Sequence, residues 1–424
     1  MLKSIHFPPH GNDLKTYGHK ETKKSVHKTV PANETSLLVA HHAYFPGRMA
    51  HTRQIVVMLE AISTLYDSII CLLPRSAAQN SDFNLERHLA ETCDAKTKVQ
   101  ERNIAVLPFR SEHRSGWGKV YDYVALRLNS IIFTIGVLLS KELRQADRIY
   151  TRHLLLAYLL TYLPSVVPKL ITEIHDLPKS PWGGLKLRRL LSMKVRVGVI
   201  SQGLATQLTH LFPRLRAKLV MVPDAISERF TSCMEEKQVA RRQLKISHEN
   251  QIVTYCGSLY DFCAPDTLLE AFKYVCGAKV SGWIIGSITP PLTRLMAEMN
   301  PPPNVKFWGW QSHDNIPLFL SASDVLVVSY AGWHWRAAQL SSPIKIFEYI
   351  AAGKPIVAPA LPSVEEILRD GETALLYRAG DAEHMSACIR RLIDDPELGE
   401  RLAARASKKV DGWTWCSRAK RLFL

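Results

Sequence analysis

The sequence lacks the long apolar run that a membrane-spanning helix requires. No window reaches the roughly 18 consecutive apolar residues needed for a span, and the nearest candidates, residues 131–139 and 154–163, are short. We expect both segments to form buried helices, with a membrane-facing position as the alternative. Residues 1–35 lack the compact apolar core of a secretory signal and are rich in Lys and His, which predicts a disordered basic tail.

Cysteine pairs and metal motifs are also missing. The 8 cysteines form no CxxC pair and several lie in apolar runs, which predicts reduced, buried thiols in a cytoplasmic protein. No Asp-x-Asp follows an expected strand and no His or Cys cluster has zinc spacing, so we expect neither a metal nor a cofactor. The lack of a G-x-G-x-x-G after any expected strand argues against a nicotinamide-dependent dehydrogenase.

Acidic residues are scarce relative to basic ones, and the formal net charge is +15. Such a charge favours a polyanionic partner, although it also serves plain solubility. Two basic clusters, residues 186–191 and 240–245, mix charge with leucine as interfacial amphipathic helices do. No nucleic-acid-binding motif accompanies them, so we expect no nucleic acid. Attachment to an anionic membrane surface, on the inner face of the membrane, is the resulting hypothesis.

Length and patterning predict two α/β domains. A chain of 424 residues exceeds the size at which one core keeps growing. Short apolar strands alternate with helical stretches in both halves, as in parallel sheets covered on both faces. The expected strands are residues 37–43, 68–74, 104–109, 148–153, 169–175, 197–201 and 218–225, then 252–259, 282–286, 305–310, 325–330, 355–360 and 374–378. Two Rossmann-like domains should therefore face a cleft.

Residues 341–376 are the most informative part of the chain. Ser342 is a good N-cap and Pro343 suits a first helical turn, so the amides that open this helix are expected to face an anion. Lys345 and Glu348 follow on one face. The alternative is a surface helix carrying an ordinary Lys345 and Glu348 pair. A helix start beside strand ends is nevertheless where open α/β sheets bind ligands.

After this helix, Gly353 is expected to end it in a left-handed turn, and residues 355–360 read as a buried parallel strand. The whole pattern K-x-x-E-Y-x-A-x-G-K-P resembles the donor-site signature of glycosyltransferase family 4, retaining enzymes of the GT-B fold. The resemblance implies that Glu348 binds the ribose hydroxyls of a nucleotide sugar. It also implies that the helix start, from Ser342 through Ile344 to Lys345, lies near the diphosphate.

The chain departs from the family pattern in two places. Leu340 occupies the position of a second glutamate that reads the sugar in many members. In the loop after residue 254, Gly257 is kept and is expected to present backbone amides to the diphosphate, with Ser258 beside it. Ser258 and Cys263 stand where many relatives carry basic residues, so Lys345, with Arg336 as a further candidate, would carry more of the charge.

Two other loops are candidate sites. Gly47 follows the first strand, and Arg48 and Arg53 are suited to hold an acceptor phosphate, which the resemblance places on this side of the cleft. The alternative for Gly47 is sheet geometry alone. His175 ends a strand between acidic residues, where it is a candidate catalytic group that orients a sugar hydroxyl. The alternative for His175 is a satisfied structural histidine.

The same resemblance covers nearly the whole chain from about residue 37. Residues 220–226 are similar to the family's hinge, and the segment from residue 412 resembles its last helix. The resulting domains are a basic tail (1–35), an acceptor domain (36–226), a nucleotide-sugar domain (227–410) and a helix crossing back to the first domain (411–424).

The leading hypothesis is a retaining, metal-independent glycosyltransferase of polysaccharide biosynthesis. It would move a sugar from a UDP- or GDP-linked donor to a glycan or lipid-linked acceptor. Lys345 would help to stabilise the departing diphosphate in this reaction. The alternative is a non-catalytic binding or scaffold protein that keeps the GT-B shape.

Overall fold

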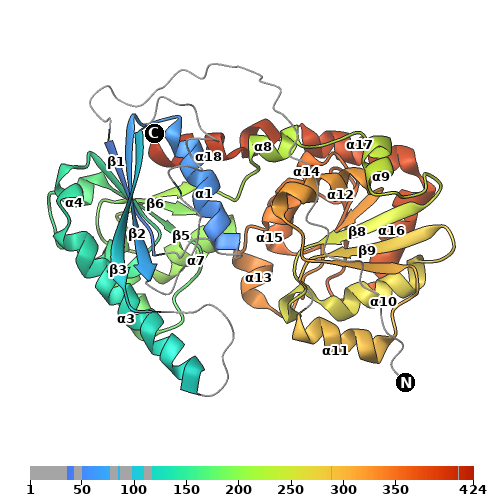
Figure 1. Cartoon of the computed structure of the whole chain (residues 1–424), viewed down its shortest axis with the longest axis horizontal. Coiled ribbons are helices and arrows are strands. Elements are labelled where there is room, and N and C mark those ends of the chain that lie inside the picture. The colour runs from blue at the N-terminus through green and yellow to red at the C-terminus, as the bar shows by residue number, and fades with distance from the viewer. Residues whose placement is uncertain are drawn as a thin grey trace.

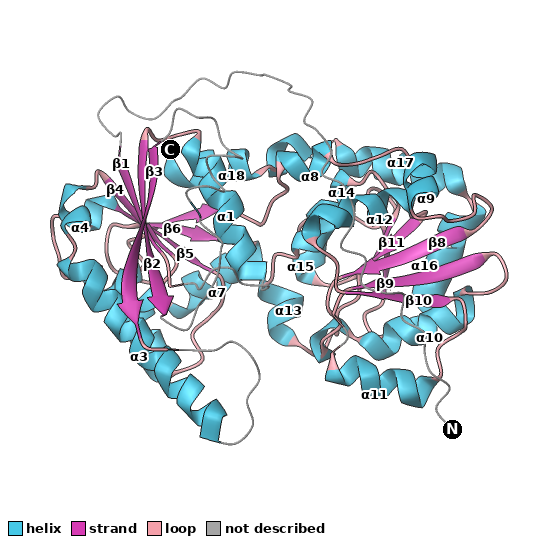
Figure 2. Cartoon of the chain, viewed as in Figure 1, coloured by secondary structure: helices cyan, strands magenta, loops and turns pink. Residues whose placement is uncertain are grey.

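The computed structural model describes residues 36–42, 50–76, 85, 98–108, 117–287, 289–408 and 410–424. These residues form two α/β domains that lie side by side, each built on one parallel sheet (Figure 1, Figure 2). The fold class expected from the sequence is therefore confirmed. The basic tail expected at residues 1–35 lies outside the described residues.

The first sheet has seven parallel strands in the order β3-β2-β1-β4-β5-β6-β7. Its strands are β1 (Ser36–Ala40), β2 (Ser68–Ser76), β3 (Lys98–Val106), β4 (Arg148–Thr151), β5 (Leu170–Ile174), β6 (Arg196–Val199) and β7 (Lys218–Met221). The helices between them are α1 (Ala50–Ser63), α3 (Trp117–Leu139), α4 (Lys141–Gln145), α5 (Leu154–Leu160), α6 (Pro181–Leu191) and α7 (Gln202–Leu211).

Both faces of this sheet are buried. Leu38 and Ala40 of β1 enter one apolar core, whereas Leu37 and Val39 enter the other. This alternation follows from the two-residue period of a strand, and burial on both faces explains why the expected strands were apolar throughout. β3 begins at Lys98, six residues before the expected start at residue 104, because an exposed edge strand tolerates the polar residues that precede it.

The second sheet has six parallel strands in the order β10-β9-β8-β11-β12-β13. Its strands are β8 (Gln251–Cys256), β9 (Val280–Ile285), β10 (Val305–Gly309), β11 (Val325–Val327), β12 (Ile356–Pro359) and β13 (Leu375–Tyr377). The helices of this half are α8 (Glu228–Ser232), α9 (Lys237–Gln243), α10 (Pro265–Val275), α11 (Pro290–Met299), α12 (Ile316–Ala322), α13 (Trp335–Leu340), α14 (Ile344–Ala351), α15 (Pro362–Glu365), α16 (Ala382–Asp394), α17 (Pro396–Ser407) and α18 (Trp415–Phe423).

Within the described residues the chain crosses between the domains at two neighbouring places. The first crossing runs through Ile226, whose N–H donates to the carbonyl of Trp413 at 2.8 Å, and the N–H of Trp415 donates back to Ile226 at 3.1 Å. α18 then packs on the first domain, where the Phe423 ring lies 5.8 Å from Tyr66 and 5.3 Å from Tyr150. The two crossings and α18 therefore join the domains along one edge (Figure 1).

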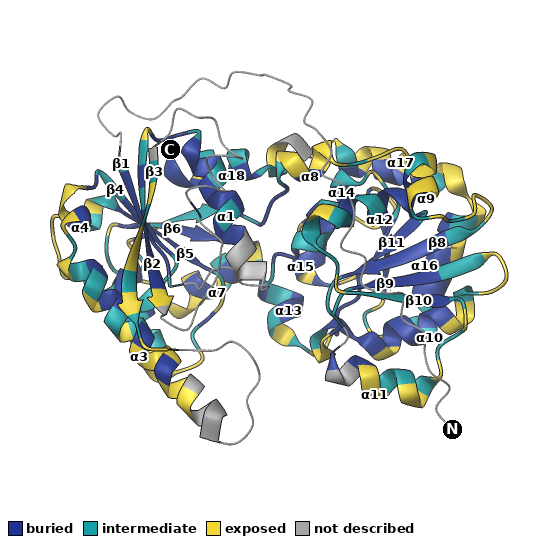
Figure 3. Cartoon of the chain, in the orientation of Figure 1, coloured by how far each residue is buried: buried dark blue, intermediate teal, exposed yellow. Residues whose placement is uncertain are grey.

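The two basic clusters differ in how they are buried. Leu187, Leu190 and Leu191 of the first cluster are buried in the core of the first domain. In the second cluster Arg241 is buried and donates to the carbonyl oxygens of Ala322 and His248. The apolar side chains of the first cluster therefore face the core, and the interpretation of that cluster as an interfacial helix is wrong. Figure 3 shows α9, which carries most of the second cluster, largely in the colour of exposed residues, so an interfacial position of this cluster stays a prediction. None of the described helices combines the length and apolarity needed to cross a bilayer.

Candidate active site

The expected donor helix is α14, which begins at Ile344 and ends where Gly353 takes a left-handed φ of 62°, as predicted. Tyr349 fixes this helix to the sheet, because its hydroxyl accepts the N–H of Cys256 at 2.7 Å. The expected N-cap at Ser342 is wrong, since Pro343 occupies the cap position. The Ser342 hydroxyl instead accepts the N–H of Asp224 at 2.8 Å, which ties the helix start to the first crossing.

Lys345 lies against the loop that follows β8. Its Nζ donates to the hydroxyl of Tyr255 at 2.8 Å and lies 5.0 Å from the centre of the Tyr330 ring. Burial lowers the pKa of Lys345. Gly257 has a φ of +138°, and a Cβ at this position would lie 3.0 Å from Lys345 Nζ. The structure therefore brings together the lysine and the glycine loop, including Ser258, that the sequence proposed separately.

Glu348, one helical turn later, faces a different partner. Its Oε1 lies 2.6 Å from Nε2 of His313, in the loop after β10. The His313 ring in turn lies 4.9 Å from the ring of Phe230. Lys345 and Glu348 thus point to separate partners and do not form the surface pair that was the alternative. His313 was not predicted, because a histidine in a loop without a motif carries no sequence signal.

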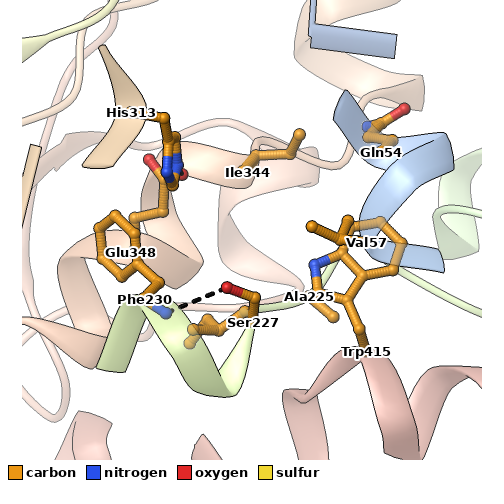
Figure 4. Close-up of a pocket in the computed structure, with 10 residues that line it drawn as sticks. Gln54, Val57, Ala225, Ser227, Phe230, His313, Ile344, Glu348 and Trp415 are labelled. Carbon is orange, nitrogen blue, oxygen red and sulfur yellow. Dashed lines mark hydrogen bonds and ion pairs between the residues drawn. The ribbon is translucent and has the colours of Figure 1, made fainter. Parts of the chain in front are cut away.

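Glu348 and His313 border a small pocket between the two domains. Figure 4 shows that its walls come from α1, from the first crossing, from α14 and from α18. The residues that line it are Gln54, Val57, Ala225, Ile226, Ser227, Phe230, His313, Ile344, Glu348 and Trp415. Residues of both domains and of α18, the helix that crosses back, therefore line the pocket together.

His175 stands at the carboxyl end of β5, as predicted, and both of its ring nitrogens have partners. Its Nε2 lies 2.8 Å from Glu173 Oε2, and its Nδ1 lies 2.9 Å from a guanidinium nitrogen of Arg152. A carboxylate only accepts and a guanidinium only donates, so the neutral ring must carry its hydrogen on Nε2. Burial and the nearby Arg152 lower the pKa of His175 to about 4, which keeps it neutral at physiological pH.

Glu173 is fully buried and charged. Although burial alone would raise its pKa, the Arg418 guanidinium and the hydrogen bond from His175 hold that pKa well below its usual range. Arg418 donates to both carboxylate oxygens, at 2.9 and 2.8 Å. The hydroxyl of Tyr150 donates to the same carboxylate at 2.7 Å. The two carboxylate oxygens of Glu173 thus accept hydrogen bonds from Arg418, His175 and Tyr150.

A second buried acid lies on the other side of Arg152. Arg152 donates to Gln54 Oε1 at 3.0 Å, and Gln54 Nε2 donates to both carboxylate oxygens of Asp224, each at 3.0 Å. Burial raises the pKa of Asp224 to about 6. Since Asp224 also binds Ser342, a continuous chain of hydrogen bonds runs from the start of α14 to Arg418 on α18.

Further contacts between the domains close the other side of the cleft. Arg336 pairs with Asp176 and donates to the carbonyl of Leu177 at 2.9 Å, so its guanidinium points at the first domain. Leu340 is buried in the core of the first domain. The carboxylate of Glu366 accepts the first two amides of α7, at 2.8 and 2.9 Å. Leu340, at the position of the second family glutamate, thus serves domain contact.

The structure describes the predicted acceptor residues only in part. Gly47 and Arg48 lie outside the described residues. Arg53 belongs to α1, but its side chain also lies outside the description. Their role in acceptor binding stays a prediction.

Comparison with known proteins finds matches mainly in the second domain. Residues 250–395 match the family model described as glycosyl transferases group 1. The lipopolysaccharide core biosynthesis glycosyltransferase LpsE of Rhizobium meliloti is 29% identical over 185 residues, which are 43% of this chain and 51% of that protein. Alpha-D-kanosaminyltransferase of Streptomyces kanamyceticus is 30% identical over 122 residues, 29% of this chain and 30% of that protein. The chain thus spans about half the length, or less, of these curated relatives.

Solved structures resemble the chain over nearly its full length. Sucrose-phosphate synthase from Thermosynechococcus elongatus has a TM-score of 0.65 at 17% identity, covering 92% of this chain and 97% of that one. HepE of Anabaena, in complex with UDP-glucose, has a TM-score of 0.64 at 15% identity, covering 92% and 98%. At this identity the likeness shows the fold, which is the two-domain GT-B arrangement of these proteins.

Proposed function

We propose that this chain, which has the GT-B fold and whose residues 250–395 match the glycosyl transferases group 1 model, is a glycosyltransferase that uses a nucleotide-sugar donor. The observation that carries the proposal is the meeting of Gly257 with Lys345 at the start of α14, one turn from Glu348 at the pocket between the domains. The relatives give no support to the non-catalytic alternative, since they are named as glycosyltransferases.

The donor diphosphate would lie at the loop of Gly257 and Ser258, beside Lys345. Transfer leaves negative charge on the departing diphosphate, and a cation held in a water-poor site stabilises that charge strongly. Lys345 is suited to this task because its ammonium is buried beside Tyr255, at the first turn of a helix whose dipole also favours an anion. This arrangement supplies the needed positive charge from the chain itself, so we propose metal-independent transfer. Retention of stereochemistry is proposed from the family alone.

Glu348 would hold the donor ribose. Its carboxylate now meets His313, and a ribose hydroxyl entering the pocket would compete for the same oxygens. The neighbouring HepE structures contain UDP and UDP-glucose, which supports a uridine donor over a GDP-linked one. The proposed donor-binding residues are therefore Gly257, Ser258, Ser342, Pro343, Ile344, Lys345 and Glu348.

The acceptor would be a glycan or a lipid-linked glycan. LpsE and LpsD of Rhizobium meliloti are named for lipopolysaccharide core biosynthesis, as is the neighbouring structure WaaG for lipopolysaccharide biosynthesis. Such acceptors favour a protein held at the inner face of the membrane. α3 supports this proposal, because Val124, Leu128, Ile131, Ile135 and Leu139 are exposed along it at a spacing of three or four residues. The net charge of +15 would add attraction to anionic lipid.

Ligand-dependent thermal stability would test the donor site. We expect one nucleotide class to stabilise the wild-type protein, by roughly 2.7 kcal/mol at about 100 times the dissociation constant. Glu348→Ala should lose that stabilisation together with transfer activity. Glu372→Ala is the matched control, since Glu372 is an exposed acid of the same domain. A Glu348→Ala protein that folds and transfers sugar at the wild-type rate would refute the assignment.

A further inference from the structure

Arg418 is a buried cation in a helix that otherwise packs by apolar contacts. It lies on α18 and is 1% exposed. Its neighbours Ala419, Leu422 and Phe423 belong to the apolar core of the first domain that also contains Leu37 and Val39 of β1. Replacing a buried ion pair by apolar groups of similar volume is often neutral or stabilising. Packing alone therefore gives no reason for an arginine here. Its partners supply a reason.

The guanidinium of Arg418 uses three of its nitrogens on fixed partners. Two donate to Glu173, in the bidentate manner that gives an arginine–carboxylate pair its geometric specificity. The third, Nε, donates to the carbonyl of Pro223 at 3.0 Å, within the first crossing between the domains. Arg418 thus links the end of β5 to the connection between the domains.

The effect of this link reaches the pocket through His175. Arg418 keeps the buried Glu173 ionised, and because an ionised carboxylate only accepts, the His175 nitrogen that faces it must donate. Nδ1 of His175 therefore presents a lone pair to Arg152. Arg152 then donates with the same nitrogen to Gln54, which lines the pocket. Arg418 lies on α18 and Glu173 on β5, whereas His175 and Arg152 directly follow β5 and β4, and each of the four side chains is at most about a quarter exposed.

We infer, on the basis of the transfer activity proposed above, that Arg418 is a positioning residue for that reaction. Through Glu173 it fixes the tautomer and the ring orientation of His175, and the Nδ1 lone pair of His175 then holds the Arg152 guanidinium beside the pocket. His175 in this arrangement acts as a link and not as a base, because neither of its nitrogens is open. The helix that crosses back thereby contributes to the site from the far end of the chain.

Arg418→Met tests this inference against a matched control. Arg241 is likewise a buried arginine, 2% exposed, that binds two backbone carbonyls and a carboxylate, but in the second domain. Arg241→Met should therefore report the loss of stability that any such arginine gives. Arg418→Lys restores a cation without the bidentate fork. For each variant we would measure kcat and donor KM per folded protein. We would also record ¹⁵N spectra of the histidine rings, with the His175 signals assigned by their absence in His175→Gln.

We expect His175 of the wild-type protein to show the Nε2–H tautomer alone. In Arg418→Met the buried Glu173 loses the cation that keeps it ionised and in place, and a protonated or displaced Glu173 no longer requires a donor at Nε2 of His175. The tautomer pattern should then be lost, and kcat should fall by roughly tenfold or more with donor KM changed little, as for a misplaced group far from the bond that reacts. Arg418→Lys should recover part of both, and Arg241→Met should lower the melting temperature while keeping the wild-type kcat.

Two results would overturn the inference. One is an unchanged His175 tautomer in Arg418→Met, and the other is a kcat equal to that of Arg241→Met. Failure of the proposed function looks different: the wild-type protein would then transfer sugar from no nucleotide donor. That result would remove any role of Arg418 in transfer, whereas the tautomer of His175 in Arg418→Met would still decide whether the link exists.

Discussion

Asp224→Asn should stabilise this protein at neutral pH, although it removes a charged group from a buried hydrogen-bond network. Asp224 is 3% exposed and lies at the first crossing between the domains. Burial raises its pKa from the ordinary value of 3.8 to about 6, although Arg418 and Arg152 nearby oppose the shift. Native Asp224 therefore holds its proton more tightly than the unfolded chain does.

The sign of the effect follows from proton linkage. Between pH 4 and pH 6 the native state binds more protons at this site than the unfolded state, so the free energy of unfolding falls as pH rises. Above pH 6 both states are ionised and the full deficit remains. The shift from 3.8 to about 6 corresponds to about 3 kcal/mol at neutral pH.

Asparagine removes this deficit but loses one contact. Its Oδ1 still accepts one hydrogen bond from Gln54 Nε2, whereas its amide nitrogen replaces the second carboxylate oxygen, also 3.0 Å from Gln54 Nε2. That loss costs about 1 kcal/mol. The backbone contact with Ser342 is unaffected. We therefore expect Asp224→Asn to be more stable than the wild-type protein by about 2 kcal/mol at pH 7.5.

Urea denaturation from pH 4.5 to pH 7.5 would measure both the size and the pH dependence. Other acids titrate in both proteins, so the difference between wild type and Asp224→Asn isolates this one site. The gap should be largest at pH 7.5 and nearly close at pH 4.5. A variant that is less stable at pH 7.5, or a gap that does not change with pH, would show that Asp224 is not a strained buried carboxylate.

Three further outcomes test the proposed reaction. Lys345→Met should reduce kcat/KM by roughly a hundredfold, as for loss of a group that stabilises transition-state charge, and near-normal steady-state turnover would exclude that role. Transfer should persist in excess EDTA, and loss of activity restored by a divalent metal would contradict metal independence. Ile131→Glu with Ile135→Glu should weaken co-sedimentation with anionic vesicles at low salt, whereas Leu211→Glu, on an exposed site of α7, should not. Equal binding by all three proteins would remove α3 as the membrane face.

The sequence predicted the elements whose signal is local. The strand periodicity and the left-handed Gly353 depend on neighbouring residues, and both are found. The N-cap at Ser342 failed although its local pattern was good, because the Ser342 hydroxyl is used by Asp224 from a distant segment. The prediction for residues 186–191 failed for a related reason, since one amphipathic pattern serves a core-facing and a membrane-facing helix equally well.

The parts of the site that sequence reasoning missed are those made by long-range pairing. Arg152, Gln54 and Arg418 carry no motif, and each would pass as a surface residue of its own element. Their importance appears only when parallel strands bring β4 beside β5 and α18 returns to cover both. His175 was found because two acids flank it, but its link to Arg152 was not, since the arginine follows another strand.

The domain contacts bear on how the donor sugar would be read. Leu340 packs in a core of the first domain and its carbonyl accepts a hydrogen bond from the Ser201 hydroxyl at 2.8 Å, so the end of α13 contacts the first domain. A glutamate at residue 340 would bury an unpaired charge in that core, which is strongly unfavourable. Leucine at residue 340, where many family members carry glutamate, therefore suits the apolar contact between the domains. Under the proposed function, recognition of the sugar would then depend on groups other than the one at residue 340, and we expect Arg152, which His175 holds beside the pocket-lining Gln54, to be a candidate for that role.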